Sequence, residues 1–307
     1  MKCTILGGGG FLGSHLCEYL IEAGHSVRVF ESPNARYLGM IKDLGAEIVL
    51  GDFLNPADLD AGITDSDVVF HLVSTTDPKK SNDDPVYDVE TNVVGTINLL
   101  LKIVKGRVGK VIFASSGGTV YGIPQEIPIS EDHETNPISS YGITKLTVEK
   151  YLALFNRLYG LDYCVLRVAN AYGERQPIQG SQGVIGAFLH KAIHNQQVEI
   201  WGEGNQIRDF IYAKDITAAF EKVMTYSGEQ KVMNIGSGEG HSINDILYTI
   251  EQTIKAPLNV KYLPGRQFDV PINILDSTLA MKNLDWQPRI SLPEGIARSY
   301  QWMLSHQ

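Results

Sequence analysis

The sequence predicts an α/β fold in which a doubly wound parallel sheet is joined to a smaller, interleaved C-terminal lobe. Up to about residue 170, short β-branched runs alternate with segments of helical periodicity. A glycine-rich turn joins the first predicted strand to the first predicted helix. After residue 170, loops and short strands replace this alternation. Strands that alternate with helices of this length favour a parallel sheet covered on both faces.

The first half of the chain is expected to supply most of the sheet. The run CTIL precedes a helix with leucines at positions 12, 16 and 20, and the strand SVRVF follows that helix. Such strand–helix–strand units are right-handed almost without exception. Further strands are predicted over 46–52, 67–74, 110–116 and 162–170, and helices over 88–105 and 144–160.

The second half is expected to build the smaller lobe and to return once to the sheet. Predicted here are a loop over 171–184, a helix over 185–196 and short strands within 198–216. A helix over 215–224 and a strand over 232–236 fit a return to the main sheet. The predicted sheet domain is therefore 1–168 with 211–236, and the smaller lobe comprises 169–210 and 237–307.

Composition argues against several classes of function. The 307 residues carry a net charge of −9, and no Lys/Arg cluster offers a basic face to nucleic acid. Cys3, Cys17 and Cys164 are scattered without metal-ligand spacing, so we expect a reducing compartment and no metal site. No stretch approaches the roughly 18 apolar residues of a membrane span, and the N-terminal run is too short for a signal peptide. A cytoplasmic protein is expected.

The turn at residues 7–13 has the pattern of a dinucleotide-binding site. Glycines in the order G-x-x-G-x-x-G allow a tight turn, a close approach of pyrophosphate to the backbone, and close helix–strand packing. The free N–H groups at the start of the following helix bind the anion. The strand before the turn and the helix after it distinguish this pattern from a merely flexible turn. The expected cofactor contacts are Gly7, Gly10, Phe11, Leu12 and Gly13.

An acidic residue ends the second predicted strand. Glu31 follows Gly13 by 18 residues, where a carboxylate accepts hydrogen bonds from the adenosine ribose hydroxyls. Because this carboxylate would repel a 2′-phosphate, NAD is predicted in preference to NADP. Arg36 nearby is a mild sign in the other direction, and we interpret it as a solvated loop residue.

Tyr141 and Lys145 lie four residues apart at the start of a predicted helix, so their side chains share one face. Taken alone, this window fits an ordinary surface helix. Beside a dinucleotide site, the same pair can do chemistry. A cation about 4 Å from a phenol contributes roughly 4 kcal/mol at an effective dielectric near 20. That is on the order of three pKa units, enough to make the phenol a base near neutral pH.

Several motifs, in collinear order, resemble the short-chain dehydrogenase/reductase superfamily. GGGGFLGSHL, NVVGT, SSGGTVYG, YGITK, LRVANAYGERQ and RDFIYAKD look like its extended branch, the nucleotide-sugar epimerases and dehydratases. The match runs from residue 1 to about 295. The resemblance implies a Rossmann-type NAD-binding domain, a nucleotide-sugar-binding lobe and an NAD-dependent enzyme.

The resemblance also implies three catalytic residues. Tyr141 would be the base, and Lys145 would tune it and reach the nicotinamide ribose. Ser116 would donate a hydrogen bond to the reacting oxygen. Because SSGGTVYG carries one more glycine than the family's usual pattern, Ser115 is the alternative.

The loop after Ser116 bears on the reaction. Dehydratases and decarboxylases of the branch carry a carboxylate there, whereas this chain has Gly117, Gly118 and Thr119. The keto-sugar reductases use a Ser-Cys pair that is missing here. The resemblance thus implies C4 epimerisation of a UDP-hexose or UDP-N-acetylhexosamine through a 4-keto intermediate. The alternatives are another NAD-dependent nucleotide-sugar enzyme (a UDP-glucuronate epimerase or decarboxylase, a dehydratase or a reductase) and a non-catalytic redox-sensing protein.

Substrate contacts follow from the family position by position. Arg208 and Arg266 match its diphosphate-binding arginines, whose planar guanidinium suits that group. Asp269 matches an acid on the uridine ribose, and Asn170 matches a phosphate and sugar contact. Asn273 falls at the gate beside the sugar C2 substituent, where a residue smaller than Tyr is expected to admit N-acetyl sugars.

Further cofactor contacts are implied in the same way. Asp52 and Phe53 look like the contact to the adenine edge, and Asn92 matches a contact near Tyr141. A helix cap is the plain alternative for Asn92. His71 is interpreted as a strand-end residue that packs under the cofactor. The helices near 92–105 and 140–159 are candidates for the dimer interface of relatives, so a homodimer is expected.

Overall fold

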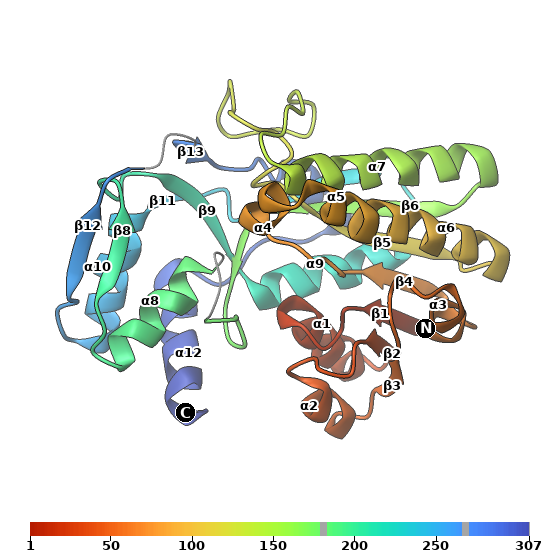
Figure 1. The fold of residues 1–307 in the computed structure, drawn as a ribbon, viewed down its shortest axis with the longest axis horizontal. Helices are drawn as coiled ribbons and strands as arrows, with labels where there is room; N and C mark the ends of the chain where they lie inside the picture. The colour runs from red at the N-terminus through yellow and green to blue at the C-terminus, as the bar shows by residue number, and fades with distance from the viewer. Residues whose placement is uncertain (179–182, 266–269, 307) are drawn as a thin grey trace.

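The computed structural model describes residues 1–178, 183–265 and 270–306. Its centre is a seven-stranded parallel sheet with the order β10-β6-β5-β4-β1-β2-β3 (Figure 1). The strand order reverses between β1 and β4, as in a Rossmann fold. The strands are β1 (Lys2–Leu6), β2 (Ser26–Glu31), β3 (Glu47–Leu50), β4 (Val68–His71), β5 (Lys110–Ser116), β6 (Asp162–Val168) and β10 (Val232–Ile235).

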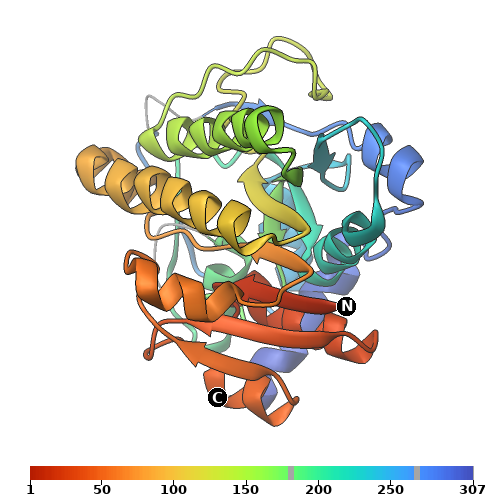
Figure 2. The ribbon, with the colours of Figure 1, turned by 90° about the vertical axis from the view of Figure 1, so that its right-hand side faces the viewer.

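Helices cover both faces of this sheet (Figure 2). On one face, α1 (Phe11–Glu22) and α9 (Ala213–Thr225) pack in a single apolar cluster. On the other face, α3 (Pro56–Ile63), α6 (Gly95–Gly106) and α7 (Ser140–Tyr159) bury a second cluster. Strands covered on both sides are apolar along their length, and every residue of β4 is buried. The predicted doubly wound α/β fold is confirmed.

The chain between β2 and β5 contains short helices and one irregular turn. In place of the single helix predicted over 88–105, α5 (Pro85–Asp88) and the π-helix η1 (Val89–Val94) precede α6. Within this stretch, the hydroxyl of Thr91 donates to the Tyr87 carbonyl at 2.7 Å. Isolated π turns of this kind often lie at functional sites. The remaining short helices are α2 (Leu38–Asp43) and α4 (Pro78–Asp83).

The smaller lobe is built around β9 (Ile207–Tyr212), which pairs with three short strands. A separate parallel ladder joins two further strands, and a third apolar cluster holds the lobe's helices together. The strands are β7 (Asn170–Tyr172), β8 (Val198–Trp201), β11 (Gly240–Ser242), β12 (Val260–Leu263) and β13 (Ile272–Asn273). The helices of this lobe are α8 (Val184–Ile193), α10 (Ile243–Ile254) and α12 (Leu292–Ser305), whereas α11 (Thr278–Leu284) buries Ala280 and Leu284 in the cluster of α1 and α9 on the large sheet.

The two parts of the fold are interleaved along the chain. After β9 in the smaller lobe, α9 and β10 return to the large sheet, where β10 pairs with β6. Among the helices of the described residues, none is both long and apolar enough to cross a membrane.

Candidate active site

A cavity of about 700 Å³ lies where the carboxyl ends of the large sheet face the smaller lobe. Its walls include the turn after β1, the ends of β5 and β6, the first turn of α7, and residues of β7 and β9. In open α/β sheets, ligands bind at this edge, where the strand order reverses. Of the predicted site residues, the cavity is lined by Gly7, Gly10, Phe11, Leu12, Gly13, Ser116, Tyr141, Lys145, Asn170 and Arg208.

The glycine turn fits a dinucleotide. Gly7 has φ 84°, a conformation that side chains disfavour. A Cβ at Gly13 would lie 2.1 Å from the Gly7 carbonyl oxygen, so only glycine allows α1 to start this close to β1. The N-cap of α1, Gly10, has no side chain to bond the first N–H groups, and the first turn holds no acidic residue. These N–H groups can therefore bind a pyrophosphate.

Glu31 lies beside this turn at the end of β2. Its carboxylate accepts hydrogen bonds from Gly9 N at 3.0 Å and Ser32 N at 2.9 Å, which orient the side chain. Each carboxylate oxygen keeps a second lone pair for a ribose hydroxyl. Arg36 lies with its guanidinium carbon 5.6 Å from the centre of the Tyr37 ring.

Asp52 and Phe53, predicted at the adenine edge, do not line the cavity. Phe53 is buried and stacks on His71, with ring centres 5.4 Å apart. His71 in turn bonds Thr96 Oγ1 at 2.8 Å, and burial lowers its pKa to about 3. The imidazole is therefore neutral, in keeping with a packing residue. The contact between Asp52, Phe53 and adenine stays a prediction.

Tyr141 and Lys145 are positioned by the start of α7. The Ser139 side chain caps the helix by accepting from Gly142 N at 3.2 Å. One turn further on, Lys145 Nζ donates to the Ala114 carbonyl at 2.9 Å. The same Nζ is 5.5 Å from the centre of the Tyr141 ring. Both side chains border the cavity, so the surface-helix interpretation of this window is wrong.

The predicted lowering of the Tyr141 pKa is not found in this structure. Burial raises the pKa of Tyr141 to about 12, and the charges of Asp88 and Asp77 act in the same direction, while a hydrogen bond with Ser74 opposes them. Burial also lowers the pKa of Lys145 to about 8. The loss of water around each group is the largest cause of both shifts, and the ammonium lies beside the ring and bonds a carbonyl rather than the phenol.

Ser115 and Ser116 end β5 with opposite orientations, as neighbouring residues of a strand do. The Ser115 hydroxyl donates to the Glu149 carboxylate in the protein interior. Both serines line the cavity, but Ser116 is more exposed, and within the described residues no hydrogen bond engages its Oγ. The geometry favours Ser116 as the hydroxyl that meets a ligand.

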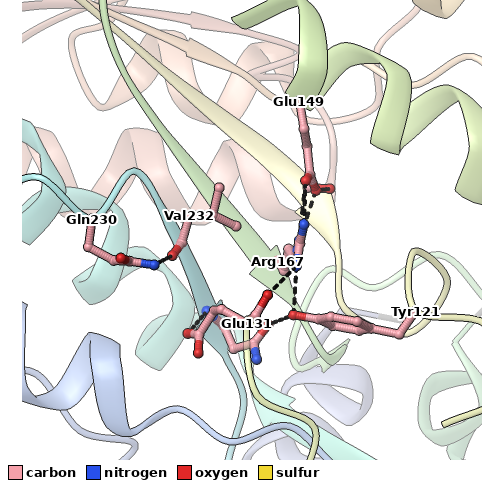
Figure 3. Close-up of polar contacts among 8 residues, drawn as sticks. Tyr121, Glu131, Glu149, Arg167, Gln230 and Val232 are labelled. Atoms are coloured by element: carbon pink, nitrogen blue, oxygen red, sulfur yellow. Dashed lines mark hydrogen bonds and ion pairs between the residues drawn. The ribbon is translucent and has the colours of Figure 1, made fainter. Parts of the chain in front are cut away.

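A buried ionic network lies behind this strand and was not predicted from the sequence. Arg167 on β6 binds Glu149 through both oxygens and donates to Tyr121 Oη at 2.9 Å (Figure 3). It thereby connects β6, α7 and the loop after Ser116. A charged residue inside the apolar strand DYCVLRV was the available signal, since a buried arginine requires a partner.

The predicted substrate contacts fall into three groups. Asn170 and Arg208 reach the cavity, and Asn170 Nδ2 donates to the Asp209 carbonyl at 3.0 Å. Arg266 and Asp269 lie outside the described residues. Asn273 does not line the cavity: it is 1% exposed and donates to the Gly117 carbonyl at 3.2 Å.

Asn92 likewise does not line the cavity. Its side chain accepts from Thr75 N at 3.2 Å and donates to the hydroxyls of Thr75 and Thr76. It lies within η1 and anchors the loop after β4, so the helix-cap interpretation is wrong. A direct contact to a cofactor stays a prediction.

Comparisons with known proteins agree with this geometry. Residues 3–236 match the model of the "NAD dependent epimerase/dehydratase family". The chain is 34% identical to the UDP-glucose 4-epimerase of Mycolicibacterium smegmatis over 98% of both chains. It is similar to the crystal structure of the Thermotoga maritima UDP-glucose 4-epimerase with UDP-glucose, with TM-score 0.95 and 33% identity over 100% of this chain and 99% of that one. A Methanobrevibacter ruminantium UDP-N-acetylglucosamine 4-epimerase in complex with UDP-N-acetylmuramic acid has TM-score 0.93 and 28% identity, over 100% and 99% of the two chains.

Proposed function

The chain belongs to the NAD dependent epimerase/dehydratase family, and on that premise we propose that it interconverts the C4 epimers of a UDP-hexose or UDP-N-acetylhexosamine. One observation carries the proposal. Ser116, Tyr141 and Lys145 border a single cavity that has the free N-terminus of α1 in one wall and Asn170 and Arg208 in another. The cavity thus offers one set of contacts to the cofactor, a second to the reacting sugar hydroxyl and a third to the nucleotide.

The residues that would hold NAD are the glycine turn, the first N–H groups of α1 and Glu31. The N–H groups bind the pyrophosphate, and the Glu31 carboxylate accepts from ribose hydroxyls. NAD, when bound, supplies an acceptor for the hydride of the sugar C4 and a positively charged ring. Lys145 Nζ, at the end of β5 near the Ala114 carbonyl, is placed to donate to a ribose hydroxyl as well.

Protons are moved by Tyr141 and Ser116. Tyr141 Oη takes the proton of the C4 hydroxyl, and Ser116 Oγ donates a hydrogen bond to the C4 oxygen as charge develops there. With a pKa of about 12, only about one Tyr141 side chain in 10⁵ is ionised at pH 7. The base therefore requires added positive charge, part of which Lys145 provides.

The loop after Ser116 supports epimerisation over the other reactions of the family. Gly117, Gly118 and Thr119 carry no carboxylate, and a Cβ at Gly117 would lie 2.4 Å from a methyl carbon of Leu275, so a side chain there would have to displace that methyl group. Among the described residues that line the cavity, Asp77 is the only one with a carboxylate. This carboxylate accepts hydrogen bonds from Lys79 N and Lys80 N, both at 3.0 Å. An acid placed to eliminate water or to assist decarboxylation is thus not found in this loop.

We propose that N-acetylated sugars are accepted beside plain hexoses. The support is the match of Asn273 to the family's gate position in the sequence; in this structure its side chain is 1% exposed, donates to the Gly117 carbonyl and does not line the cavity. Asn273→Tyr is expected to suppress turnover of UDP-N-acetylhexosamines by at least about tenfold and to spare UDP-glucose. Equal losses for both substrates would contradict the gate.

The proposed function is tested by giving the purified protein and NAD one UDP-sugar at a time and following the products by NMR. UDP-glucose, UDP-N-acetylglucosamine and UDP-glucuronate are the informative substrates, and Tyr141→Phe is the inactive control that still binds NAD. Formation of the C4 epimer from one of the first two supports the proposal. Release of CO₂ or loss of water would instead assign a decarboxylase or dehydratase, and net consumption of NADH in a parallel reaction supplied with NADH would assign a reductase.

We further propose a homodimer that pairs the outer faces of α6 and α7. Large apolar side chains are exposed on these faces, among them Leu101, Leu154 and Leu158. A second copy that presents the same face would cover them. Light scattering is expected to show twice the chain mass, and Leu101→Glu with Leu158→Glu is expected to give monomers.

A cytoplasmic location is proposed on the state of the cysteines. Cys3, Cys17 and Cys164 are free thiols and all are buried. Burial raises their pKa values, to about 11 for Cys3 and about 12 for the other two, so they are unreactive. Such thiols fit a reducing compartment. Fractionation of the source cells is the test, and recovery in a membrane or secreted fraction would contradict it.

A further inference from the structure

Asp88 is a buried carboxylate against the first turn of α7. Its side chain is 0% exposed, at the end of α5. Oδ2 accepts from Ser140 Oγ at 2.7 Å and from Thr144 Oγ1 at 3.2 Å. Ser140 precedes Tyr141 and Thr144 precedes Lys145, so Asp88 holds the turn of the helix that carries both.

The other oxygen of Asp88 holds the loop after β4. Oδ1 accepts from Asn92 Nδ2 at 2.9 Å and from the Thr76 hydroxyl. This loop also carries Ser74, which borders the cavity, donates to the Thr76 carbonyl at 3.1 Å and acts to lower the pKa of Tyr141. Two segments that meet at Tyr141 are therefore joined through one carboxylate.

The charge of Asp88 is not offset by an ion pair. Its four donors are neutral groups, and within the described ranges no cationic nitrogen lies within 4 Å of it. By contrast, Glu149, the other carboxylate near Lys145, is bound by the Arg167 guanidinium. A buried carboxylate without an adjacent cation is costly, and the nearby Lys145 ammonium is the group that its field favours.

The titratable groups around Lys145 are few. Asp88 acts most strongly among the charges that raise the Lys145 pKa, Glu149 acts second, and both oppose the effect of burial. The other neighbours are Tyr141 on the same helix and His71 on β4, which is neutral. Asp88 therefore affects Tyr141 and Lys145 in two ways. Its hydrogen bonds hold the helical turn that carries them, and its charge raises the pKa of both.

We propose that Asp88 is a positioning residue of the active site, whose buried carboxylate fixes the first turn of α7 against the Ser74 loop and favours the charged form of Lys145. The inference rests on the proposed function, because it gives Tyr141 and Lys145 their roles. Asp88 itself does not line the cavity and acts through these residues.

The test is a direct titration of Lys145 in protein labelled with [ε-¹³C]lysine. The Lys145 resonance is assigned by its absence from Lys145→Met, and in the wild type it is expected to titrate near pH 8. In Asp88→Asn, which keeps the shape and removes the charge, the midpoint is expected to fall by about one unit. An unchanged midpoint would overturn the proposal. If Asp88→Asn does not fold, Asp88→Ser is measured in the same way.

Two variants separate charge from structure. Asp84→Asn removes an exposed carboxylate from the cap of the same short helix, and the Lys145 midpoint is expected to stay unchanged. Thr144→Val removes one donor to Asp88 but keeps its charge. Faster amide exchange over 140–146 with an unchanged midpoint is expected, whereas the same midpoint shift as in Asp88→Asn would assign the effect to structure and overturn the charge role.

Activity gives a separate readout. In Asp88→Asn, kcat is expected to fall about fivefold at pH 8 with KM changed less than about twofold, because a midpoint one unit lower reduces the charged fraction of Lys145 at that pH from about one half to about one tenth. The titration itself needs no substrate. If the wild type turned over no UDP-sugar, the proposed function would fail while the titration still decided the role of Asp88.

Discussion

At the end of β5, two adjacent serines have different partners, and this difference assigns their roles. Strand alternation predicts opposite orientations for Ser115 and Ser116, but only the partner shows which one faces the interior. That partner is Glu149, one helical turn after Lys145. The sequence motifs predicted some of the residues that border the cavity, among them Ser116, Tyr141 and Lys145. It did not reveal Asp88, Glu149 or Arg167, because their roles depend on contacts between distant segments.

Ser116→Ala is expected to lower kcat by about 10² or more, because it removes a donor to the developing charge on the C4 oxygen. Ser115→Ala is the matched variant and is expected to reduce stability by about 1–3 kcal/mol, since the Glu149 carboxylate loses a buried donor. Steady-state kinetics and thermal unfolding of both variants make the comparison. The reverse pattern would exchange the roles of the two serines.

Lys145→Met is expected to move the activity profile toward high pH. Without the ammonium, the Tyr141 phenol ionises less readily, so the base forms only at higher pH. In the wild type, activity is expected to decline above about pH 8 as Lys145 loses its proton. Lys150→Met, an exposed change on the same helix, serves as the control. An unchanged profile in Lys145→Met would refute the tuning role.

At the scale of elements, the sheet was predictable and the turn at η1 was not. Apolar runs of four to seven residues leave little choice for β1, β4 and β5, because both faces of these strands are covered. The π turn has no comparable signal, since it depends on the bonds between the Asn92 side chain and a loop 16 or 17 residues away. The short strand β7 likewise exists only because β9 lies beside it.

In the strand–turn–helix unit at the N-terminus, the close contact between Gly13 and the Gly7 carbonyl can be tested. Gly13→Ala is expected to weaken NAD binding at least about tenfold and to cost about 1–3 kcal/mol of stability, because its Cβ would collide with the Gly7 carbonyl. Calorimetry with NAD and thermal unfolding measure the two effects. Gly39→Ala in α2 meets no atom within 4 Å and is the control. Wild-type NAD affinity in Gly13→Ala would contradict the proposed cradle.

At the scale of the whole molecule, a buried polar cluster ties the smaller lobe to the cofactor helix. Arg175, in the loop after β7, bonds His15 Nδ1 at 2.7 Å and forms an ion pair with Glu18, both on α1. His15 also bonds the Glu174 carbonyl at 2.8 Å. The motif YGERQ suggested only a loop, so this link between the two parts of the fold appears only in three dimensions.

This cluster makes stability depend on pH. Burial and the Arg175 charge lower the pKa of His15 from 6.5 to about 4. Between these values, the unfolded chain binds a proton that the folded chain does not, so the free energy of unfolding falls as the pH falls. Denaturant unfolding at pH 6.5 and pH 5 is expected to show this loss, and His15→Gln is expected to reduce it. An equal loss in His15→Gln would mean that other groups cause it.

In the proposed reaction, hydride leaves the sugar C4 and returns to the opposite face. The most direct measurement is NMR of the reaction in D₂O with the UDP-sugar that is turned over. This reaction is expected to give the same final epimer ratio from either C4 epimer, a proton fully retained at C4 of the product, and no accumulation of NADH. Deuterium at C4, or a product that is not the C4 epimer, would contradict it.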